Sequence, residues 1–167
     1  MTAMTLADDA AELAAMAGVV LDAGQRRVLR VGMGKTADGR WVTFEVWQPD
    51  QAVLLARELA GLFLLDERIL HAAGSYGTAA EAFRRAAEAV TGDSMLRQRV
   101  KRVTYAAGAE SIELTGGARA RFAFWKSLRG YACDCLVTEG MASLGENTGA
   151  LLPCVAGWPD PQVWYGG

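Results

Sequence analysis

The chain has 167 residues, with 17 basic and 19 acidic side chains and a formal net charge of −2. This length favours a single domain, and a composition of 51% apolar and 22% charged residues argues against intrinsic disorder. The near-neutral total also argues against a uniformly basic nucleic-acid-binding tail, but it leaves local charged patches open.

The sequence predicts a soluble protein of a reducing compartment. Its three cysteines form no Cys-x-x-Cys pair and cannot all be paired internally. Asp8 and Asp9 stand where a secretory signal would need a basic start and an apolar run. The longest apolar stretch, residues 52–65, is shorter than the roughly 20 residues that cross a bilayer. We therefore expect no membrane partner.

The first half of the chain alternates predicted helices with short strands. Thr5 is a helix cap followed by acidic residues, and Thr78 with Glu81 forms a capping box. The helix over 52–65 lacks a polar face, which predicts burial on most sides. The predicted elements are a helix over 6–17, a mixed apolar and basic stretch over 19–39, a strand over 41–47, a helix over 52–65, a strand over 68–72 and a helix from Thr78 to Val90.

Alternating patterns replace helical ones in the second half. Residues 99–105, 110–114 and 118–125 predict three antiparallel strands with glycines at the turns. A strand over 131–138, a short helix over 147–154 and a strand over 162–165 follow. Helices alternating with short apolar strands predict an α/β fold with a mainly parallel sheet, on which the antiparallel segment is an insertion or flank.

Two short motifs resemble catalytic loops but lack their context. Gly32 to Thr36 resembles the end of a phosphate-binding loop, but a turn and a strand follow it instead of a helix. Ser75 resembles the nucleophile of a hydrolase, but the chain's one histidine, His71, precedes it. A basic surface loop and a strand-to-helix turn are the favoured interpretations, with His71 in the core or at a strand end. Cys133 and Cys135 are interpreted as buried small residues, not zinc ligands.

Positive charge is concentrated between residues 97 and 129, where eight basic side chains face two glutamates. Arg97, Arg99 and Lys101 are predicted to share one strand face, as are Arg119 and Arg121. Such a stripe can contact a phosphate backbone. A solvated outer face of an antiparallel sheet explains the same pattern, and both interpretations stay open.

The order of several segments resembles the ATPase domain of tailed-phage terminase large subunits, the motors that package DNA. The similar segments are 56–65, 69–71, 81–85, 116–119, 129–131 and 161–165. The resemblance implies a RecA-like, P-loop ATPase-type sheet that binds ATP and Mg²⁺ at its strand ends. It divides the chain into an N-terminal helix over 1–18 and an ATPase-like domain over 19–167, without the nuclease domain that follows in relatives.

The resemblance also implies roles for individual residues and partners. Gln25 matches a glutamine that contacts adenine, and Arg129 matches the arginine ahead of the Walker B strand, here residues 135–138. Glu139 falls on the Walker B acids, either as the magnesium ligand or, with the register shifted by one, as the catalytic carboxylate. The implied partners are DNA and the phage portal or small terminase subunit, in the cytoplasm of a bacterial host.

The departures from the family bear on activity. Residues 48–51, Gln-Pro-Asp-Gln, lack the glycine and lysine of the phosphate loop, so Walker A is degenerate. Glu139-Gly140 also lacks one of the two Walker B acids, and the chain stops where relatives continue. We therefore expect a truncated domain with impaired ATP hydrolysis. The alternatives are a non-catalytic DNA- or protein-binding fragment and an inactive prophage relic.

Overall fold

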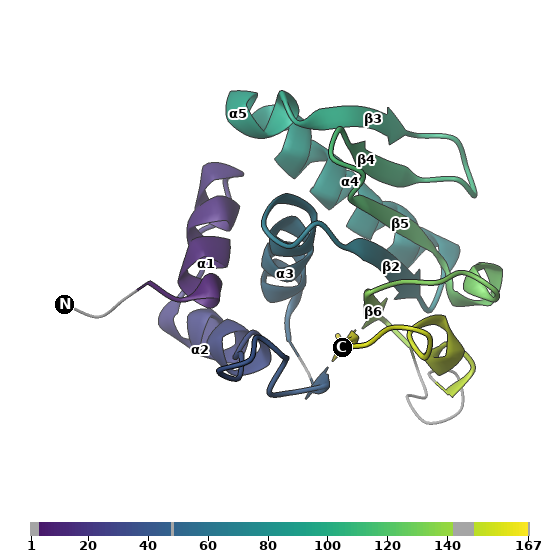
Figure 1. Ribbon diagram of the computed structural model, residues 1–167. Coiled ribbons are helices and arrows are strands. Elements are labelled where there is room, and N and C mark those ends of the chain that lie inside the picture. The colour runs from purple at the N-terminus through teal and green to yellow at the C-terminus, as the bar shows by residue number, and fades with distance from the viewer. Residues whose placement is uncertain (1–3, 48, 142–148, 167) are drawn as a thin grey trace.

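One seven-stranded sheet organises the residues that the computed structural model describes, 4–47, 49–141 and 149–166 (Figure 1). In chain order the strands are β1 (Glu45–Trp47), β2 (Arg68–Ala73), β3 (Val100–Thr104), β4 (Ser111–Leu114), β5 (Arg119–Phe124), β6 (Cys135–Glu139) and β7 (Gln162–Tyr165). Their order in space is β1-β7-β6-β2-β5-β4-β3. Neighbours from β1 to β5 are parallel, whereas β4 pairs antiparallel with β5 and β3. The predicted α/β class with an antiparallel flank is confirmed.

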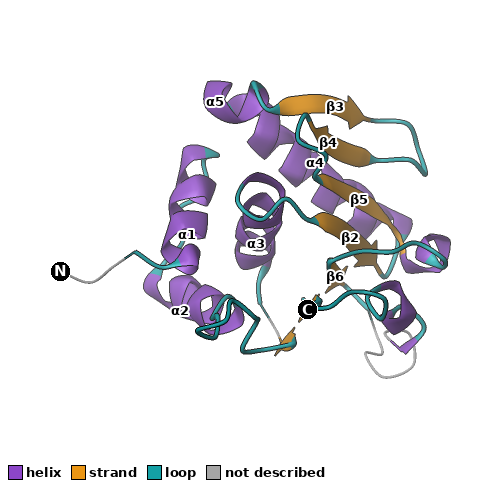
Figure 2. Cartoon of the chain, viewed as in Figure 1, coloured by secondary structure: helices purple, strands orange, loops and turns teal. Residues whose placement is uncertain are grey.

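The helices lie beside and behind the strands of this sheet (Figure 2). In the described residues they are α1 (Leu6–Met16), α2 (Ala23–Gly32), α3 (Gln51–Phe63), α4 (Tyr76–Gly92) and α5 (Ser94–Arg97), with 3-10 helices η1 (Trp125–Leu128) and η2 (Leu152–Cys154). None of the described helices is long and apolar enough to span a membrane.

Helix α3 is buried on nearly every side, as its lack of a polar face predicts. It lies between α1 and the sheet (Figure 1), and every residue from Val53 to Phe63 is buried. Helix α1 packs against the side of α3 that faces away from the sheet. It does so through small side chains such as Ala10 and Ala14, which allow close approach. Helix α4 contacts β2, β3 and β5 next to α3. Two helices thus cover one face of the sheet, and a third covers α3.

The two faces of the sheet have separate cores, because side chains alternate along each strand. Ile69 and Phe122 belong to the large core under α3 and α4. Leu70, Leu136 and Val163 belong to a smaller core with residues of η1, η2 and their neighbouring loops. No residue of β3 or β4 belongs to that second core. The cover on this face therefore does not extend over the antiparallel flank.

The prediction that Arg97, Arg99 and Lys101 share one strand face is wrong. The Asp93 carboxylate accepts hydrogen bonds from the backbone N–H groups of residues 95 and 96, which caps α5. Arg97 therefore ends a helix, and Arg99 precedes β3, which begins at Val100. The pairing of β3 with β4 also shifts by one residue after Val100. Arg97, Arg99 and Lys101 consequently do not share a strand face.

Two helices begin at other residues than the sequence predicts. Helix α2 lies in the stretch for which no helix is predicted, although Asp22 and Gln25 form a capping box at its start. Helix α4 is capped by Ser75, whose hydroxyl accepts a hydrogen bond from the Thr78 N–H at 3.1 Å. The predicted cap at Thr78 is therefore wrong, and the Ser75 hydroxyl serves the helix start.

Several elements are also shorter than predicted. Strand β1 covers only the last three residues of 41–47, and β6 begins at Cys135 instead of residue 131. Of the helix predicted over 147–154, the structure has a 3-10 turn, and residues 147 and 148 lie outside the described residues. The stretch after Gly32 turns back on itself without a helix, which excludes a phosphate loop there.

Candidate functional site

The carboxyl ends of β1, β7, β6 and β2 share one edge of the sheet, where open α/β folds bind ligands. The structure brings two of the predicted site residues to this edge. Gln25 contacts the connection between β1 and α3, and Glu139 ends β6. Arg129 is exposed beyond η1 and lines a separate hollow of about 540 Å³ with residues such as Tyr131 and Pro153. Among the described residues it makes no hydrogen bond or ion pair with Gln25 or Glu139.

The connection from β1 to α3 is only three residues long. Strand β1 ends at Trp47, and Asp50 is the N-cap of α3. One Asp50 carboxylate oxygen accepts the Val53 N–H at 3.1 Å. Helix N-termini attract anions because their N–H groups are unpaired and their dipole is positive there. At α3 that anion is the chain's own carboxylate.

Gln25 ties the start of α2 to the start of α3. Its side-chain oxygen accepts the Asp22 N–H at 2.8 Å, and its amide group donates to the second Asp50 oxygen at 2.9 Å. Its backbone N–H donates to the Asp22 carboxylate at 2.8 Å. The side chain predicted to contact adenine is thus engaged in holding two helix starts together.

Glu139 lies in a row of four charged side chains, of which Glu58, His71 and Glu139 are buried and Arg85 is partly exposed. His71, on the neighbouring strand β2, places Nε2 2.8 Å from the Glu139 carboxylate and contacts Glu58 of α3 through Nδ1. Arg85 of α4 donates to both Glu139 oxygens at 3.0 Å. His71 and Glu139 are only 1% and 2% exposed. The cluster therefore joins strands β2 and β6 to helices α3 and α4, which cover the same face of the sheet.

The charges in this cluster are balanced. Burial disfavours a charged imidazole, but the carboxylates of Glu58 and Glu139 outweigh it and raise the pKa of His71 from 6.5 to about 9. Burial would raise the pKa of Glu139, yet His71 and Arg85 lower it below its ordinary value. At neutral pH two cations thus face two carboxylates. His71, expected only in the core or at a strand end, is the centre of this arrangement.

The residues present do not form a site for ATP and Mg²⁺. No lysine lies between β1 and α3, where a carboxylate occupies the helix start. The Glu139 oxygens are held by Arg85 and His71, so a metal ion would have to displace both. No group of three or more described histidine, cysteine, aspartate or glutamate residues is arranged to hold a metal.

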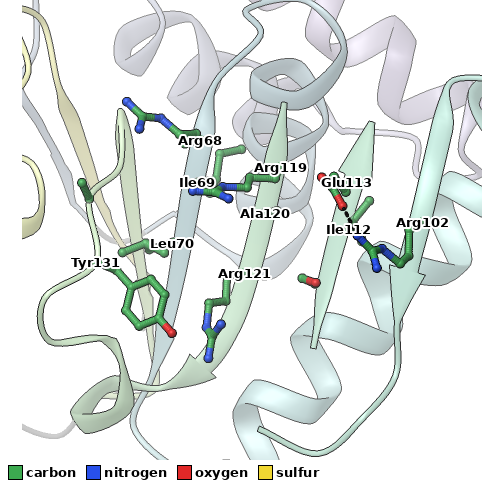
Figure 3. Close-up of a pocket in the computed structure, with 12 residues that line it drawn as sticks. Arg68, Ile69, Leu70, Arg102, Ile112, Glu113, Arg119, Ala120, Arg121 and Tyr131 are labelled. Atoms are coloured by element: carbon green, nitrogen blue, oxygen red, sulfur yellow. Dashed lines mark hydrogen bonds and ion pairs between the residues drawn. The ribbon is translucent and has the colours of Figure 1, made fainter. Parts of the chain in front are cut away.

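The predicted basic residues separate into two environments. Arg99 turns towards the end of α3, where it donates to the Phe63 carbonyl at 3.0 Å. Lys101 lies 3.9 Å from Glu113. Arg119 and Arg121, by contrast, lie in a groove together with Arg68 and Arg102 (Figure 3). The sequence gives no signal for Arg68, because only the parallel pairing of β2 with β5 brings it there.

No protein-family model and no curated protein matches this sequence. Its fold nevertheless belongs to a known class, the α/β fold of phage large terminase ATPase domains. The chain is similar to the large terminase of bacteriophage HK97, with a TM-score of 0.73 and 14% identity over 88% of this chain and 33% of that one. It is also similar to the large terminase ATPase domain of Thermus phage P74-26, with a TM-score of 0.56 and 16% identity over 91% and 66%.

These likenesses confirm the RecA-like fold that the resemblance implies. The chain spans about a third of the length of the HK97 large terminase. Sequence identities of 14% and 16% support a shared fold only.

Proposed function

We propose that this chain is a terminase-ATPase-like domain that serves phage DNA packaging without hydrolysing ATP. The observation that carries the proposal is the carboxylate of Asp50 at the start of α3, in place of a glycine- and lysine-containing loop. The family's partners, DNA with the portal or the small terminase subunit, are proposed for this chain because its fold is similar to that of phage large terminases.

Electrostatics supports the loss of nucleotide binding. Phosphates of ATP at the start of α3 would approach the Asp50 carboxylate, which no lysine of the connection offsets. Two like charges 4 Å apart repel by about 4 kcal/mol at an effective dielectric constant of about 20. Phosphoryl transfer depends on the opposite arrangement, in which cations stabilise charge on the phosphates.

The position of Glu139 also supports the loss of ATP hydrolysis. A Walker B carboxylate must reach a magnesium ion or an attacking water. Here Arg85 and His71 hold both of its oxygens inside the core. Gly140, the next residue, has no side chain to replace it. We infer that Glu139 has a structural role in this chain.

ATP turnover by the purified protein tests the proposal, and we expect a rate no higher than background. The same assay is run on Glu139→Gln and on Glu88→Gln, a matched change of an exposed glutamate on α4 that pairs with Arg84. Turnover that disappears in Glu139→Gln but persists in Glu88→Gln would show that the chain is an active ATPase.

A second candidate function is DNA binding that needs no nucleotide. The arginines gathered in one groove over β2, β3, β4 and β5 favour it. The groove does not include the connection between β1 and α3, where Asp50 caps the helix. DNA binding in the groove is therefore compatible with the loss of nucleotide binding at that connection.

A further inference from the structure

The face of the sheet opposite α3 and α4 carries a groove of about 270 Å³ over β2, β5, β4 and β3 (Figure 3). Arg68, Arg102, Arg119 and Arg121 line it, with Glu113 between them and Tyr131 at one side. It lies beside the second core, to which β3 and β4 contribute nothing. We call these four arginines with Tyr131 the arginine groove.

Strand pairing places the groove's charges in a row. Arg68 of β2 pairs with Arg119 of β5, Arg119 with Glu113 of β4, and Glu113 with Arg102 of β3. Paired residues point to the same face, so the row crosses four adjacent strands. Neighbouring strands are about 4.8 Å apart, which makes the row about 14 Å long. Arg121 lies two residues further along β5 than Arg119.

The groove has more positive charge than its carboxylates offset. Arg102 is paired with Glu113 at 3.2 Å, and Arg68 is 3.6 Å from Asp134. Among the described residues no ion pair involves Arg119 or Arg121. Arg121 donates to the Gly108 carbonyl at 3.0 Å and lies over the Tyr131 ring at 4.4 Å, while its Nε is buried without a hydrogen-bond partner. The charge of Arg119 and Arg121 is thus available to an anion.

We propose that the arginine groove binds the phosphodiester backbone of a nucleic acid. Guanidinium groups form paired hydrogen bonds with phosphate oxygens, and a row of them suits a chain of phosphates better than one ion. Phosphates recur along each strand of a nucleic acid, so a row of about 14 Å is long enough to contact more than one of them. Tyr131, 40% exposed at the side of the groove, offers a ring on which an unpaired base can stack. The inference rests on the second candidate function and is independent of ATP hydrolysis.

Fluorescence anisotropy of a labelled 20-nucleotide strand and its duplex tests this groove, without ATP and at 50 and 200 mM salt. We expect binding that weakens with salt, and at least a tenfold loss in the double variant Arg119→Ala/Arg121→Ala. Its salt slope should also be smaller by about two, because two phosphate contacts are removed. The single variant Arg119→Gln, at an exposed position, should lose affinity without disturbing the fold.

The matched control is the double variant Arg84→Ala/Arg97→Ala, which removes two exposed arginines outside the groove. We expect this control variant to lose less than threefold in affinity for DNA. Equal losses in the two double variants, or binding that does not change with salt, would overturn the proposal. Inorganic phosphate, at the same total phosphate concentration as the unlabelled DNA, should compete poorly. Equal competition would identify a simple anion site instead.

Discussion

His71 is the residue on which the buried cluster depends. It is the one histidine in the chain, and its imidazole contacts a carboxylate on either side. Breaking a buried ion pair by removing one partner costs about 3–5 kcal/mol, because the other charge is left uncompensated. We therefore expect His71→Gln to lower the free energy of unfolding by several kcal/mol, measured by urea denaturation at pH 7.

The same residue makes stability depend on pH. The pKa of His71 is raised from 6.5 to about 9 in the folded protein. Its stabilising contribution is therefore fully present below about pH 6.5 and is lost as pH rises through 9. We expect the difference in unfolding free energy between wild type and His71→Gln to shrink between pH 7 and pH 10. A constant difference would mean that the imidazole is neutral in the fold.

Glu139 gives the opposite dependence at acid pH. Its pKa is lowered from 4.5, so its contribution is present above that value and is lost as pH falls through the lower folded value. The cluster should consequently be most stabilising between pH 4.5 and pH 6.5, the ordinary pKa values of the two groups. This window follows from the direction of the two pKa shifts.

At the scale of elements, the proposed loss of ATP hydrolysis depends on the start of α3. We expect Asp50→Ala to lower the free energy of unfolding by about 1 kcal/mol, because the helix loses its cap and Gln25 loses an acceptor. Asp50→Asn keeps a capping side chain and should lower the free energy of unfolding by only a few tenths of a kcal/mol. Equal losses in a thermal denaturation experiment would contradict the capping role.

Helix α1 offers a test of how far the core extends. Ala10 is fully buried against α3, whereas Ala15 is exposed on the same helix. We expect Ala10→Glu to destabilise the protein by at least about 2 kcal/mol, because an unpaired charge is buried, and Ala15→Glu to have little effect. Denaturation curves that are the same for both variants would show that α1 contributes little to the domain's stability.

For the whole molecule, local patterns were enough to predict most elements and the class of fold. The apolar run of α3, the short strands β2 and β7 and the antiparallel flank were all predicted from period and turn residues. Helix α2 was missed although its capping box is present in the sequence, because its apolar face is narrow and its residues are mostly basic or exposed.

The sites were harder to predict because they join residues distant in the chain. Glu58 and Glu139 lie 13 and 68 positions from His71, and no local pattern links the three. Arg68 meets Arg119 only because β5 pairs in parallel with β2. The predicted stripe from Arg97 to Lys101 failed for a local reason, the cap at Asp93, that is visible in the sequence.

Under the proposed function, the Asp50-capped start of α3 sets a limit on what the molecule can do mechanically. A motor alternates between strong and weak grip on its track, and the free energy of a chemical reaction drives that alternation in one direction. A protein that holds DNA through the arginine groove and has no such reaction has a single affinity at a given salt concentration. Under the proposed function it can resist the sliding of DNA or mark a position on it. It cannot move DNA against a load.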